Sequence, residues 1–485
     1  MLVRAQRTAA RLLQSPLFVV GILTLVAAAL RIYHLSFKSL WLDEAQLYSI
    51  TTGSLFEVLA KNGVRNSAPF LFPVLVSFVS HFRDSENALR LISCAAGIAA
   101  VPAMYMLATR FVSKYAACFA ALLAALSTAQ ITYSQQVREY ALTFLFAVLI
   151  LIGFSSFLAR PNWRNTLTLA LLLVLGILTQ YGITLLTAAL NLVFLLYLLK
   201  FRNRHALFKW VVVQSFALVA VSLVVVVSLR TQWVPQGFAA ESYLQSAYWD
   251  RTLPGFYTLA VTHTADIFNF AFEGALALFL CVLGVLTVLV ERRKRLFLAL
   301  FVTMFGITFA ASLVRFYPYQ GARHTIFLTP VVYLAIAFGF DTFVKNRQRL
   351  AAVALVAVLV FTQLPSVFAY LNNPGGENIR PLVDTLRESL QPGDRIYVYY
   401  YSTPAFSYYW RKQDTPSITS VISQTDPQAY YAQVDELTAQ PGRIWMLFSH
   451  CVFQAECHLI ATHASTRRPL ELVDSDVDAL LYLLH

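Results

Sequence analysis

Long apolar segments recur along most of the chain, and they constrain its fold more than any other feature of the sequence. Each holds about 20 residues with few charges, the length that an α-helix needs to cross the hydrocarbon core of a bilayer. Because lipid offers the backbone no hydrogen-bonding partner, such segments are expected to be helical. About eleven spans of this length are expected, near residues 14–33, 88–109, 114–131, 140–159, 165–180, 183–200, 207–229, 266–290, 296–314, 323–343 and 350–370.

The composition excludes an ordinary soluble protein. Of the 485 residues, 58% are hydrophobic and 13% are charged, and a soluble chain of this size could not hide so much apolar surface. The formal net charge of +12 does not indicate nucleic-acid binding, because the basic residues form short clusters between apolar segments, as cytoplasmic loops do. We expect a polytopic α-helical membrane protein whose surroundings are the lipid bilayer.

The same basic clusters predict the orientation of the chain. A further apolar stretch, residues 68–82, is short and carries Pro69 and Pro73, so we expect it to lie along the membrane without crossing it. All basic clusters then face one side, as the positive-inside rule requires. They are Arg4/Arg7/Arg11, Arg110/Lys114, Arg160/Arg164, Lys200/Arg202/Arg204/Lys209, Arg292/Arg293/Lys294/Arg295 and Lys345/Arg347/Arg349. The N-terminus is then cytoplasmic, as an uncleaved first span, and the C-terminal end lies outside.

The composition changes after residue 370, where residues 372–376 form a linker rich in asparagine and glycine. We therefore expect residues 1–370 to form the membrane domain, with an outer loop over 34–87, and residues 371–485 to form a soluble exterior domain. Predicted helices alternate there with predicted strands, which indicates a small α/β domain. The helices are expected over 382–390 and 426–437, and the strands over 395–401 and 444–448.

Two adjacent carboxylates, Asp43 and Glu44, follow the first apolar segment. Carboxylates beside lipid cost solvation free energy, so they require either water or a function. One interpretation is structural, because acidic side chains stabilise the N-terminus of a surface helix through the helix dipole. The other interpretation is functional, and further motifs along the chain favour it.

Four stretches occur in an order that is typical of one enzyme family. Trp41-Leu42-Asp43-Glu44 follows the first span, and residues 87–105 carry an Arg-Leu…Gly…Pro pattern. Residues 133–140 open the fourth span, and Gly321-Ala322-Arg323-His324 opens a late one. The chain thus resembles the membrane glycosyltransferases with the C-type fold, which use lipid-phosphate sugars. It is most similar to the protein O-mannosyltransferase and lipid A aminoarabinose transferase group, over about residues 15–370.

The resemblance implies roles for the charged residues of these stretches. Asp43 stands where the family has its catalytic base, and Glu44 would hold the acceptor or tune Asp43 through its like charge. The chemistry requires a base, because a hydroxyl must lose its proton while the lipid phosphate leaves already charged. Arg138 and Arg323 stand at outer span ends, where a guanidinium would bind the phosphate. Ordinary snorkelling is the alternative.

Other residues are expected to complete the pocket. His324 would help to bind the donor phosphate, and a local hydrogen-bonding role is its alternative. Tyr181 follows Gln180 in a turn that lines the pocket in the family, where many members have histidine or lysine in place of Gln180. The remaining residues expected to line the pocket are Trp41, Glu139 and Tyr140.

No metal site is assigned from the sequence, because no dense cluster of His, Asp and Glu with ligand spacing occurs in it. No glycine loop that would cradle nucleotide phosphates occurs either. Relatives often carry a basic or polar residue and two prolines before the 68–82 segment, whereas this chain reads Asn66-Ser67-Ala68-Pro69. No cofactor is therefore assigned, and a divalent metal ion is left as an open alternative.

Cys451 and Cys457 lie close together in the tail, with His450 and His458 beside them. In an oxidising exterior compartment these two thiols are expected to form a disulfide. A zinc site, whose usual ligand spacing differs, and two free thiols are the alternatives.

We therefore expect an inverting glycosyltransferase of the hexosyl- or pentosyltransferase kind in the cytoplasmic membrane. It would move a sugar from a polyprenyl-phosphate carrier to an acceptor glycan, lipid or protein on the outer face. One alternative is a lipid-linked sugar transporter or flippase, but the sequence shows no internal repeat of the kind found in transporters. A non-catalytic scaffold is a further alternative, and the joint presence of Asp43, Arg138 and Arg323 counts against it.

Overall fold

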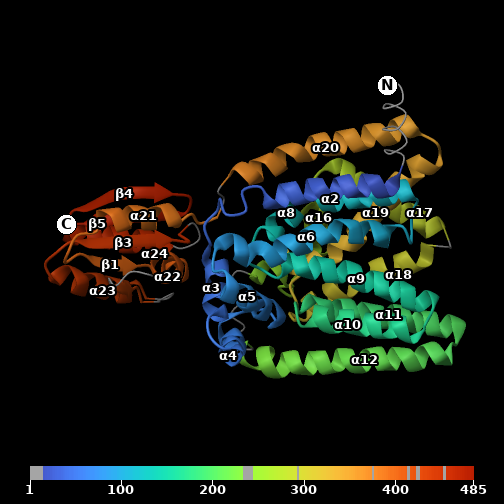
Figure 1. Ribbon diagram of the computed structural model, residues 1–485, viewed down its shortest axis with the longest axis horizontal. Coiled ribbons are helices and arrows are strands. Elements are labelled where there is room, and N and C mark those ends of the chain that lie inside the picture. The colour runs from blue at the N-terminus through green and yellow to red at the C-terminus, as the bar shows by residue number, and fades with distance from the viewer. Residues whose placement is uncertain are drawn as a thin grey trace. The chain divides into compact units, whose positions relative to one another are not determined.

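The computed structural model describes residues 15–232, 244–291, 294–373, 376–411, 416–421, 426–451 and 455–485. They form two compact units, each of which is shown in Figure 1. The helical unit consists of the described residues up to Tyr33, of Gly53–Phe82 and of Leu89–Ala369. The sheet unit consists of His34–Thr52, Arg83–Ala88 and Tyr370–His485. Five residues of the predicted basic clusters, Arg4, Arg7, Arg11, Arg292 and Arg293, lie outside the described residues.

Long apolar helices build the helical unit. Seven of those described are long and apolar enough to cross a membrane. These are α6 (Glu86–Ala108), α9 (Tyr140–Ala159), α11 (Gly182–Phe201), α12 with the π-turn η1 (Arg204–Leu229), α18 (Arg295–Leu313), η5 with α19 (Arg323–Lys345) and α20 (Arg349–Asn372). The expected class, a polytopic helical membrane protein with a small C-terminal α/β domain, is confirmed.

Two bent pairs raise the number of candidate spans among the described residues to nine. The chain bends by 54° between α7 (Lys114–Leu126) and α8 (Thr128–Ser134). It bends by 108° between Leu253–Ala271 and α17 (Ala275–Val290). The segment Leu253–Ala271 includes α15 (Leu253–Tyr257) and α16 (His263–Ala271). The two other expected spans correspond to α2 (Pro16–Ile32) and α10 (Trp163–Ile177), which have only 17 and 15 residues.

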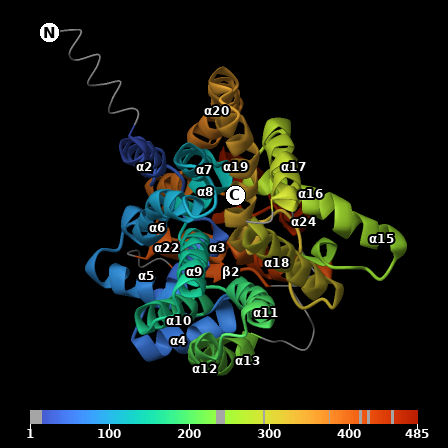
Figure 2. The ribbon, with the colours of Figure 1, turned by 90° about the vertical axis from the view of Figure 1, so that its right-hand side faces the viewer.

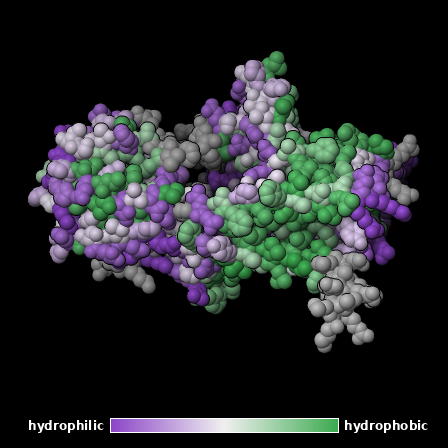
Figure 3. All heavy atoms as spheres, turned by 90° about the horizontal axis from the view of Figure 1, so that it is seen from above, coloured by the Kyte–Doolittle hydropathy of each residue, from purple (hydrophilic) through white to green (hydrophobic). Residues whose placement is uncertain are grey.

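Burial distinguishes central from peripheral helices in this unit. The apolar window of α19 is 89% buried, whereas those of α12 and α20 are only 28% and 22% buried. Figure 2 accordingly shows α12 and α20 at the periphery of the helices. Their outward residues are hydrophobic, such as Leu218, Val226 and Phe361, and Figure 3 shows hydrophobic residues over the middle of the unit. Lipid can solvate such a surface, whereas water cannot.

Two glycines let α17 and α19 pack closely. A Cβ atom on Gly284 would lie 1.9 Å from the carbonyl oxygen of Ala335, and one on Gly339 would lie 2.0 Å from that of Leu280. Any side chain at either position would push the two backbones apart. Small residues serve this purpose between membrane helices, where close van der Waals packing drives association.

The two breaks in the bent helix pairs meet each other. The Ser127 hydroxyl, which lies between α7 and α8, donates a hydrogen bond to the Ala271 carbonyl at the end of α16 (3.0 Å). The Tyr333 hydroxyl of α19 donates to the same carbonyl (2.9 Å). Interrupted helices leave backbone groups without intrahelical partners, and such groups are tolerated at membrane depth only where protein groups satisfy them.

A buried arginine satisfies the end of α7. The Arg31 guanidinium has no exposed surface and donates to the carbonyls of Ala124 (2.9 Å) and Ala125 (3.1 Å). Its Nε also donates to the Ser134 hydroxyl (3.2 Å). In return, the Gln135 amide donates to the last carbonyls of α2, including that of Tyr33 (2.8 Å). The end of α2 thus supplies donors to the end of α7 and receives donors from Gln135, the residue that caps the end of α8.

Short helices fill the loop between α2 and α6. Helix α4 (Leu55–Arg65) begins with a capping box in which Ser54 and Glu57 exchange hydrogen bonds. Helix α5 (Leu71–Phe82) has 12 residues and is therefore about 18 Å long at 1.5 Å per residue. The hydrocarbon core is about 30 Å thick, so α5 is too short to cross it. Elsewhere in the described part of this unit, short helices are α13 (Arg230–Gln232), η2 (Gln245–Ala247) and η3 (Thr258–Thr262).

The sheet unit contains one five-stranded mixed sheet in the order β2-β1-β3-β5-β4. Strands β2, β1 and β3 pair in parallel, and β5 pairs antiparallel with both β3 and β4. Its strands are β1 (Arg395–Val398), β2 (Ser417–Thr419), β3 (Ile444–Ser449), β4 (Leu470–Asp476) and β5 (Ala479–Leu484). Its helices are α3 (Leu42–Thr51), α21 (Arg380–Ser389), η6 (Tyr400–Ser402), α22 (Thr403–Trp410), α23 (Pro427–Ala439) and α24 (Ala455–Arg467).

Helices cover both faces of this sheet, since every residue of the central strand β3 is buried. Ile444, Met446 and Phe448 alternate along β3 and pack with residues of α23 and α24. Helix α21 contacts β4 and β5 and lies on the other face. Residues 34–52 and 83–88, which the sequence analysis grouped with the membrane domain, are part of this unit.

We predict that Arg31→Met destabilises the helical unit. The methionine keeps the apolar stem but leaves the carbonyls of Ala124 and Ala125 without the donors that Arg31 supplies, and each buried unsatisfied group costs about 1–3 kcal/mol. Thermal unfolding of the purified protein in detergent measures the effect. Ile32→Met on the same helix is the matched control, because Ile32 is 58% exposed. Equal melting temperatures for the two variants would contradict the prediction.

Candidate functional site

Asp43 and Glu44 occupy the first turn of α3 in the sheet unit. The helix begins after Trp41, whose backbone is extended, and Leu42 supplies its first backbone N–H. That N–H donates to a carboxylate oxygen of Glu377 (3.3 Å), so an acidic side chain from the tail sits at the positive end of the helix dipole. Glu44 is buried, with 1% of its surface exposed, and Asp43 is partly exposed.

Glu377 also binds His450. The Glu377 side chain is 2% exposed, and it accepts hydrogen bonds from His450 Nδ1 (2.6 Å) and from the Ser449 hydroxyl (3.3 Å). Burial raises the pKa of Glu377. The hydrogen bond to Glu377 raises the pKa of His450, and the negative charges of Asp478 and Asp43 contribute in the same direction. The first-loop aspartate is thus electrostatically coupled to this histidine.

Asp478 holds the segment that follows His450. Its carboxylate accepts the Cys451 backbone N–H (2.8 Å), and its carbonyl accepts the His450 N–H (3.2 Å). Cys451 and Cys457 form a disulfide with their Cα atoms 5.8 Å apart. His450 and Asp478 both have positive φ, 62° and 45°, a conformation that non-glycine residues seldom adopt. Several contacts therefore keep these two residues in a fixed arrangement.

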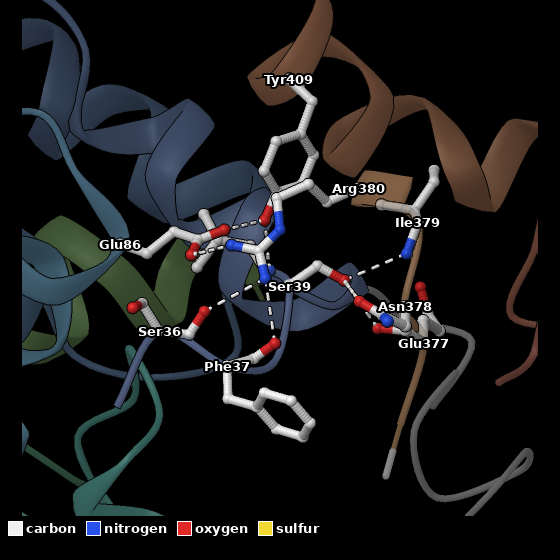
Figure 4. A network of polar contacts seen from close by, with 10 residues as sticks. Ser36, Phe37, Ser39, Glu86, Glu377, Asn378, Ile379, Arg380 and Tyr409 are labelled. Carbon is white, nitrogen blue, oxygen red and sulfur yellow. Dashed lines mark hydrogen bonds and ion pairs between the residues drawn. The ribbon is translucent and has the colours of Figure 1, made fainter. Parts of the chain in front are cut away.

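Ser39 ties the segment before α3 to the segment before α21 (Figure 4). Its hydroxyl donates to the Glu377 carbonyl (3.0 Å) or to Asn378 Oδ1 (2.9 Å), and it accepts the Ile379 backbone N–H (3.0 Å). Ser39 is 2% exposed. Because this buried hydroxyl both donates and accepts a hydrogen bond, it fixes the segment before α3 against the segment before α21.

Arg380 and Tyr409 fasten the same segment through Glu86. The Arg380 guanidinium bonds the Glu86 carboxylate (2.7 Å) and the carbonyls of Ser36 (3.1 Å) and Phe37 (2.9 Å), as Figure 4 shows. The Tyr409 hydroxyl donates to Glu86 and accepts the N–H of Leu40 (2.7 Å). The loop that carries Asp43 is therefore anchored by residues from the C-terminal part of the chain.

In the helical unit, two arginines lie beside one tyrosine ring. The guanidinium carbon of Arg138 is 5.6 Å from the centroid of Tyr140, and that of Arg323 is 5.8 Å from it. Arg138 is 6% exposed and lies 3.5 Å from the carboxylate of the buried Glu139. The Ser93 hydroxyl donates to the Arg138 carbonyl (2.9 Å). Two guanidinium groups and one carboxylate therefore lie together at the start of α9, and their net positive charge suits an anion.

Gln180 and His324 are linked through a tyrosine that the sequence analysis did not select. The Gln180 amide donates to the Tyr317 hydroxyl (2.8 Å), which in turn donates to the His324 carbonyl (2.9 Å). Gln180 also accepts the N–H of Gly182 (2.7 Å). The His324 contact involves its backbone, so it positions the turn that carries Arg323.

Tyr181 connects to the segment before α5. Its hydroxyl donates to the Gln232 side chain, whose amide donates to the carbonyls of Asn62 (3.0 Å) and Ala68 (3.1 Å). Amide groups therefore hold the segment between α4 and α5. Gln232 gave no sequence signal, because it stands alone at the end of an apolar segment.

A cavity of about 220 Å³ lies next to Tyr140. Tyr133 forms part of its wall, and the rings of Tyr133 and Tyr140 pack edge to face with centroids 5.1 Å apart. Its lining combines hydroxyl groups with aromatic rings, and ligand pockets commonly pair apolar or aromatic walls with a few polar groups. The lining residues are Ser127, Thr128, Ala129, Thr132, Tyr133, Phe270, Phe272 and Glu273.

The expected site residues thus fall into two groups, one in each unit. Trp41, Asp43, Glu44, Cys451 and Cys457 belong to the sheet unit, and the others belong to the helical unit. These others are Arg138, Glu139, Tyr140, Gln180, Tyr181, Arg323 and His324. Within each unit the chemistry differs: carboxylates and a histidine that can exchange protons in one, and guanidinium groups beside aromatic rings that can bind an anion in the other.

Comparisons with known proteins identify a matching family model and similar folds. Residues 67–229 match the family model of dolichyl-phosphate-mannose-protein mannosyltransferases. The fold is similar to that of ArnT from Cupriavidus metallidurans, solved bound to undecaprenyl phosphate, with a TM-score of 0.53 and 14% identity over 96% of this chain and 97% of that one. No match was found among curated protein sequences.

A second structural relative is the oligosaccharyltransferase AglB from Archaeoglobus fulgidus, solved with an inhibitory peptide and a dolichol-phosphate. Its TM-score is 0.53 at 13% identity, over 93% of this chain and 71% of that one. The predicted resemblance to C-type-fold membrane glycosyltransferases is therefore confirmed. Family and fold together indicate a glycosyltransferase that depends on a lipid-phosphate-linked sugar.

We predict that reduction of the Cys451–Cys457 disulfide loosens the sheet unit without unfolding the helical unit. Closing so short a loop stabilises a fold by roughly 2–3 kcal/mol on the chain-entropy model. Limited proteolysis before and after reduction measures the change, with Cys451→Ser/Cys457→Ser as the matched variant. Alkylation of both cysteines in the unreduced protein, detected by mass spectrometry, would contradict the bond.

Proposed function

We propose that this chain transfers a sugar from a polyprenyl-phosphate carrier to a hydroxyl or amide group of an acceptor at the outer face of the cytoplasmic membrane. The observation that carries the proposal is the pair of guanidinium groups of Arg138 and Arg323 beside the ring of Tyr140. Each stands at an end of an apolar helix. An anion at such a position would be the headgroup of a membrane-embedded ligand.

The arginines would bind the donor phosphate. Guanidinium groups match the geometry of phosphate oxygens and stay charged at any physiological pH. As the anomeric carbon–oxygen bond breaks, the bonding electron pair passes to the phosphate, and fixed positive charge stabilises the product as it forms. ArnT, to which the fold is similar, has been solved with undecaprenyl phosphate, which supports a polyprenyl carrier.

Asp43 would act as the general base. It would accept the proton of the acceptor group while that group's oxygen or nitrogen forms the new bond to the anomeric carbon, with inversion at that carbon. The leaving phosphate is already ionised, so no strong acid is required to assist it. Glu44 is buried beside Asp43 in the same helical turn, and we assign it to acceptor binding or to tuning the charge of Asp43.

The orientation follows from charge and oxidation state. The described basic clusters in loops such as Arg110/Lys114 and Lys345/Arg347 favour a cytoplasmic side for those loops. The disulfide in the sheet unit favours an oxidising compartment. Both arguments support a sheet unit on the exterior side of the cytoplasmic membrane.

Asp43→Asn is expected to lower the transfer rate by roughly 10²–10⁴, the contribution of a positioned base, with donor affinity changed little. The amide keeps the shape of the side chain and removes only its ability to accept a proton. Turnover of a polyprenyl-phosphate sugar by the purified enzyme measures the effect. The control is Glu388→Gln, an exposed carboxylate of the sheet unit. Near-normal turnover by Asp43→Asn would refute the assignment.

Arg138→Ala and Arg323→Ala should each weaken donor binding by about 1.5–3 kcal/mol, the value of a hydrogen bond to a charged group. Lysine at either position should restore part of the affinity, because the charge returns without the planar fork. Equilibrium binding of a polyprenyl-phosphate sugar to the purified variants tests this. Arg160→Ala, which changes an exposed arginine, should bind as the unmodified protein does. Normal binding by both alanine variants would leave snorkelling as their role.

A further inference from the structure

Three potential metal ligands meet in the sheet unit from distant parts of the sequence. Glu377, His450 and Asp478 each offer one ligand atom, and these atoms all lie within 4.8 Å of one another. Glu377 precedes α21, His450 follows β3, and Asp478 forms the turn between β4 and β5. We propose that Glu377, His450 and Asp478 form a binding site for a divalent transition-metal ion of the Zn²⁺ or Mn²⁺ class.

The donor set determines the class of ion. One imidazole nitrogen with two carboxylate oxygens suits Zn²⁺ or Mn²⁺, whereas Ca²⁺ and Mg²⁺ are usually held by oxygen ligands alone. As a metal ligand the His450 imidazole must be neutral, so binding would release its proton to solvent. The two carboxylates and the neutral imidazole would then carry a net charge of about −2, which a dication would neutralise. Three protein ligands leave a further coordination position for water or for a ligand group, as in catalytic zinc sites.

The geometry requires only a small adjustment. His450 Nδ1 and Glu377 Oε1 are 2.6 Å apart, the distance of a short, charge-assisted hydrogen bond. Metal–ligand bonds of about 2.1 Å at tetrahedral angles would set these atoms about 3.4 Å apart. The ion would therefore replace the proton between them, and this pair would move apart by about 0.8 Å. The other pairs lie within 4.8 Å and would draw together by up to about 1.4 Å, which side-chain rotation can supply.

The surroundings keep the ligands in place. The other Glu377 oxygen accepts hydrogen bonds from the Leu42 N–H and the Ser449 hydroxyl, and the Asp478 carboxylate accepts the Cys451 N–H. Hydrogen bonds of this kind orient metal-ligating carboxylates. The left-handed backbone at His450 and Asp478, which Asp and His adopt more readily than most residues, sets the direction in which each side chain leaves the backbone.

The site would also affect the candidate base. Leu42, bonded to Glu377, directly precedes Asp43, and Asp43 already acts electrostatically on His450. A dication held by Glu377 would therefore lie near the first turn of the helix that carries the candidate base. This consequence rests on the proposed function, whereas metal binding itself does not.

Metal binding by the full-length protein tests the proposal directly. Protein carrying a tag without histidine is purified in detergent, stripped with a chelator and titrated with Zn²⁺, and then with Mn²⁺. We expect one equivalent to bind at a single site. Glu377→Gln and Asp478→Asn keep the hydrogen-bond acceptors for the Leu42 and Cys451 N–H groups but remove a charged ligand. Each should weaken the affinity by more than the roughly 10–100-fold that loss of an outer-shell partner causes, and His450→Gln should do the same.

The matched control is His463→Gln. His463 is another histidine of the sheet unit that bonds a carboxylate, that of Asp435, but it lies outside the three-residue cluster. It should leave the affinity unchanged. X-ray absorption of the Zn²⁺ complex should show nitrogen and oxygen ligands without sulfur. Failure of the unmodified protein to bind either ion, equal binding by all variants, or sulfur in the coordination shell would each overturn the proposal. If Glu377→Gln does not fold, Asp478→Asn decides the outcome.

Discussion

The helical unit depends on how its interrupted helices satisfy their backbone groups. Helix α7 ends inside the unit, and lipid cannot supply donors for its last carbonyls. The buried Arg31 guanidinium of α2 supplies them, and the Gln135 amide donates hydrogen bonds to the carbonyls at the end of α2. A buried charge is costly alone, but here every contact of the guanidinium ends on a hydrogen-bond acceptor. The Arg31 side chain thereby links α2 to α7, two helices that are distant in the sequence.

The broken helices also place hydroxyl and carbonyl groups beside the cavity next to Tyr133. Ser127 and Tyr333 bond the Ala271 carbonyl, where the two breaks meet. The cavity beside Tyr133 is lined by Ser127 and by residues that flank the second break, Phe272 and Glu273. Interrupting a helix exposes hydroxyl and carbonyl groups that a continuous apolar span would keep hidden. Hydrogen bonds thus offset the cost of the breaks, and a cavity lined by both aromatic rings and hydroxyl groups lies beside them.

The sheet unit gives the first-loop carboxylates a rigid foundation. Ser39, Arg380 and Tyr409 anchor the segment before α3, and Glu377 accepts the first N–H of the helix that carries Asp43. A side chain positioned by several buried hydrogen bonds loses little further freedom during a reaction, which is how preorganised groups lower a barrier. The C-terminal part of this chain therefore has a direct role in orienting the candidate base, beyond that of an appended domain.

Sequence alone determined the class of this protein and its prominent polar residues. Apolar segments of spanning length must form helices, because lipid offers the backbone no hydrogen-bonding partner and a helix satisfies its own N–H and C=O groups. The order of the motifs along the chain identified Asp43, Arg138 and Arg323 as candidate site residues. Tertiary structure alone decided which residues become neighbours. Glu377, His450 and Asp478 are separated by 73 and 28 positions, so no ligand spacing could reveal them. Sheet pairing and helix packing bring such residues together, and these long-range contacts leave no local pattern in the sequence.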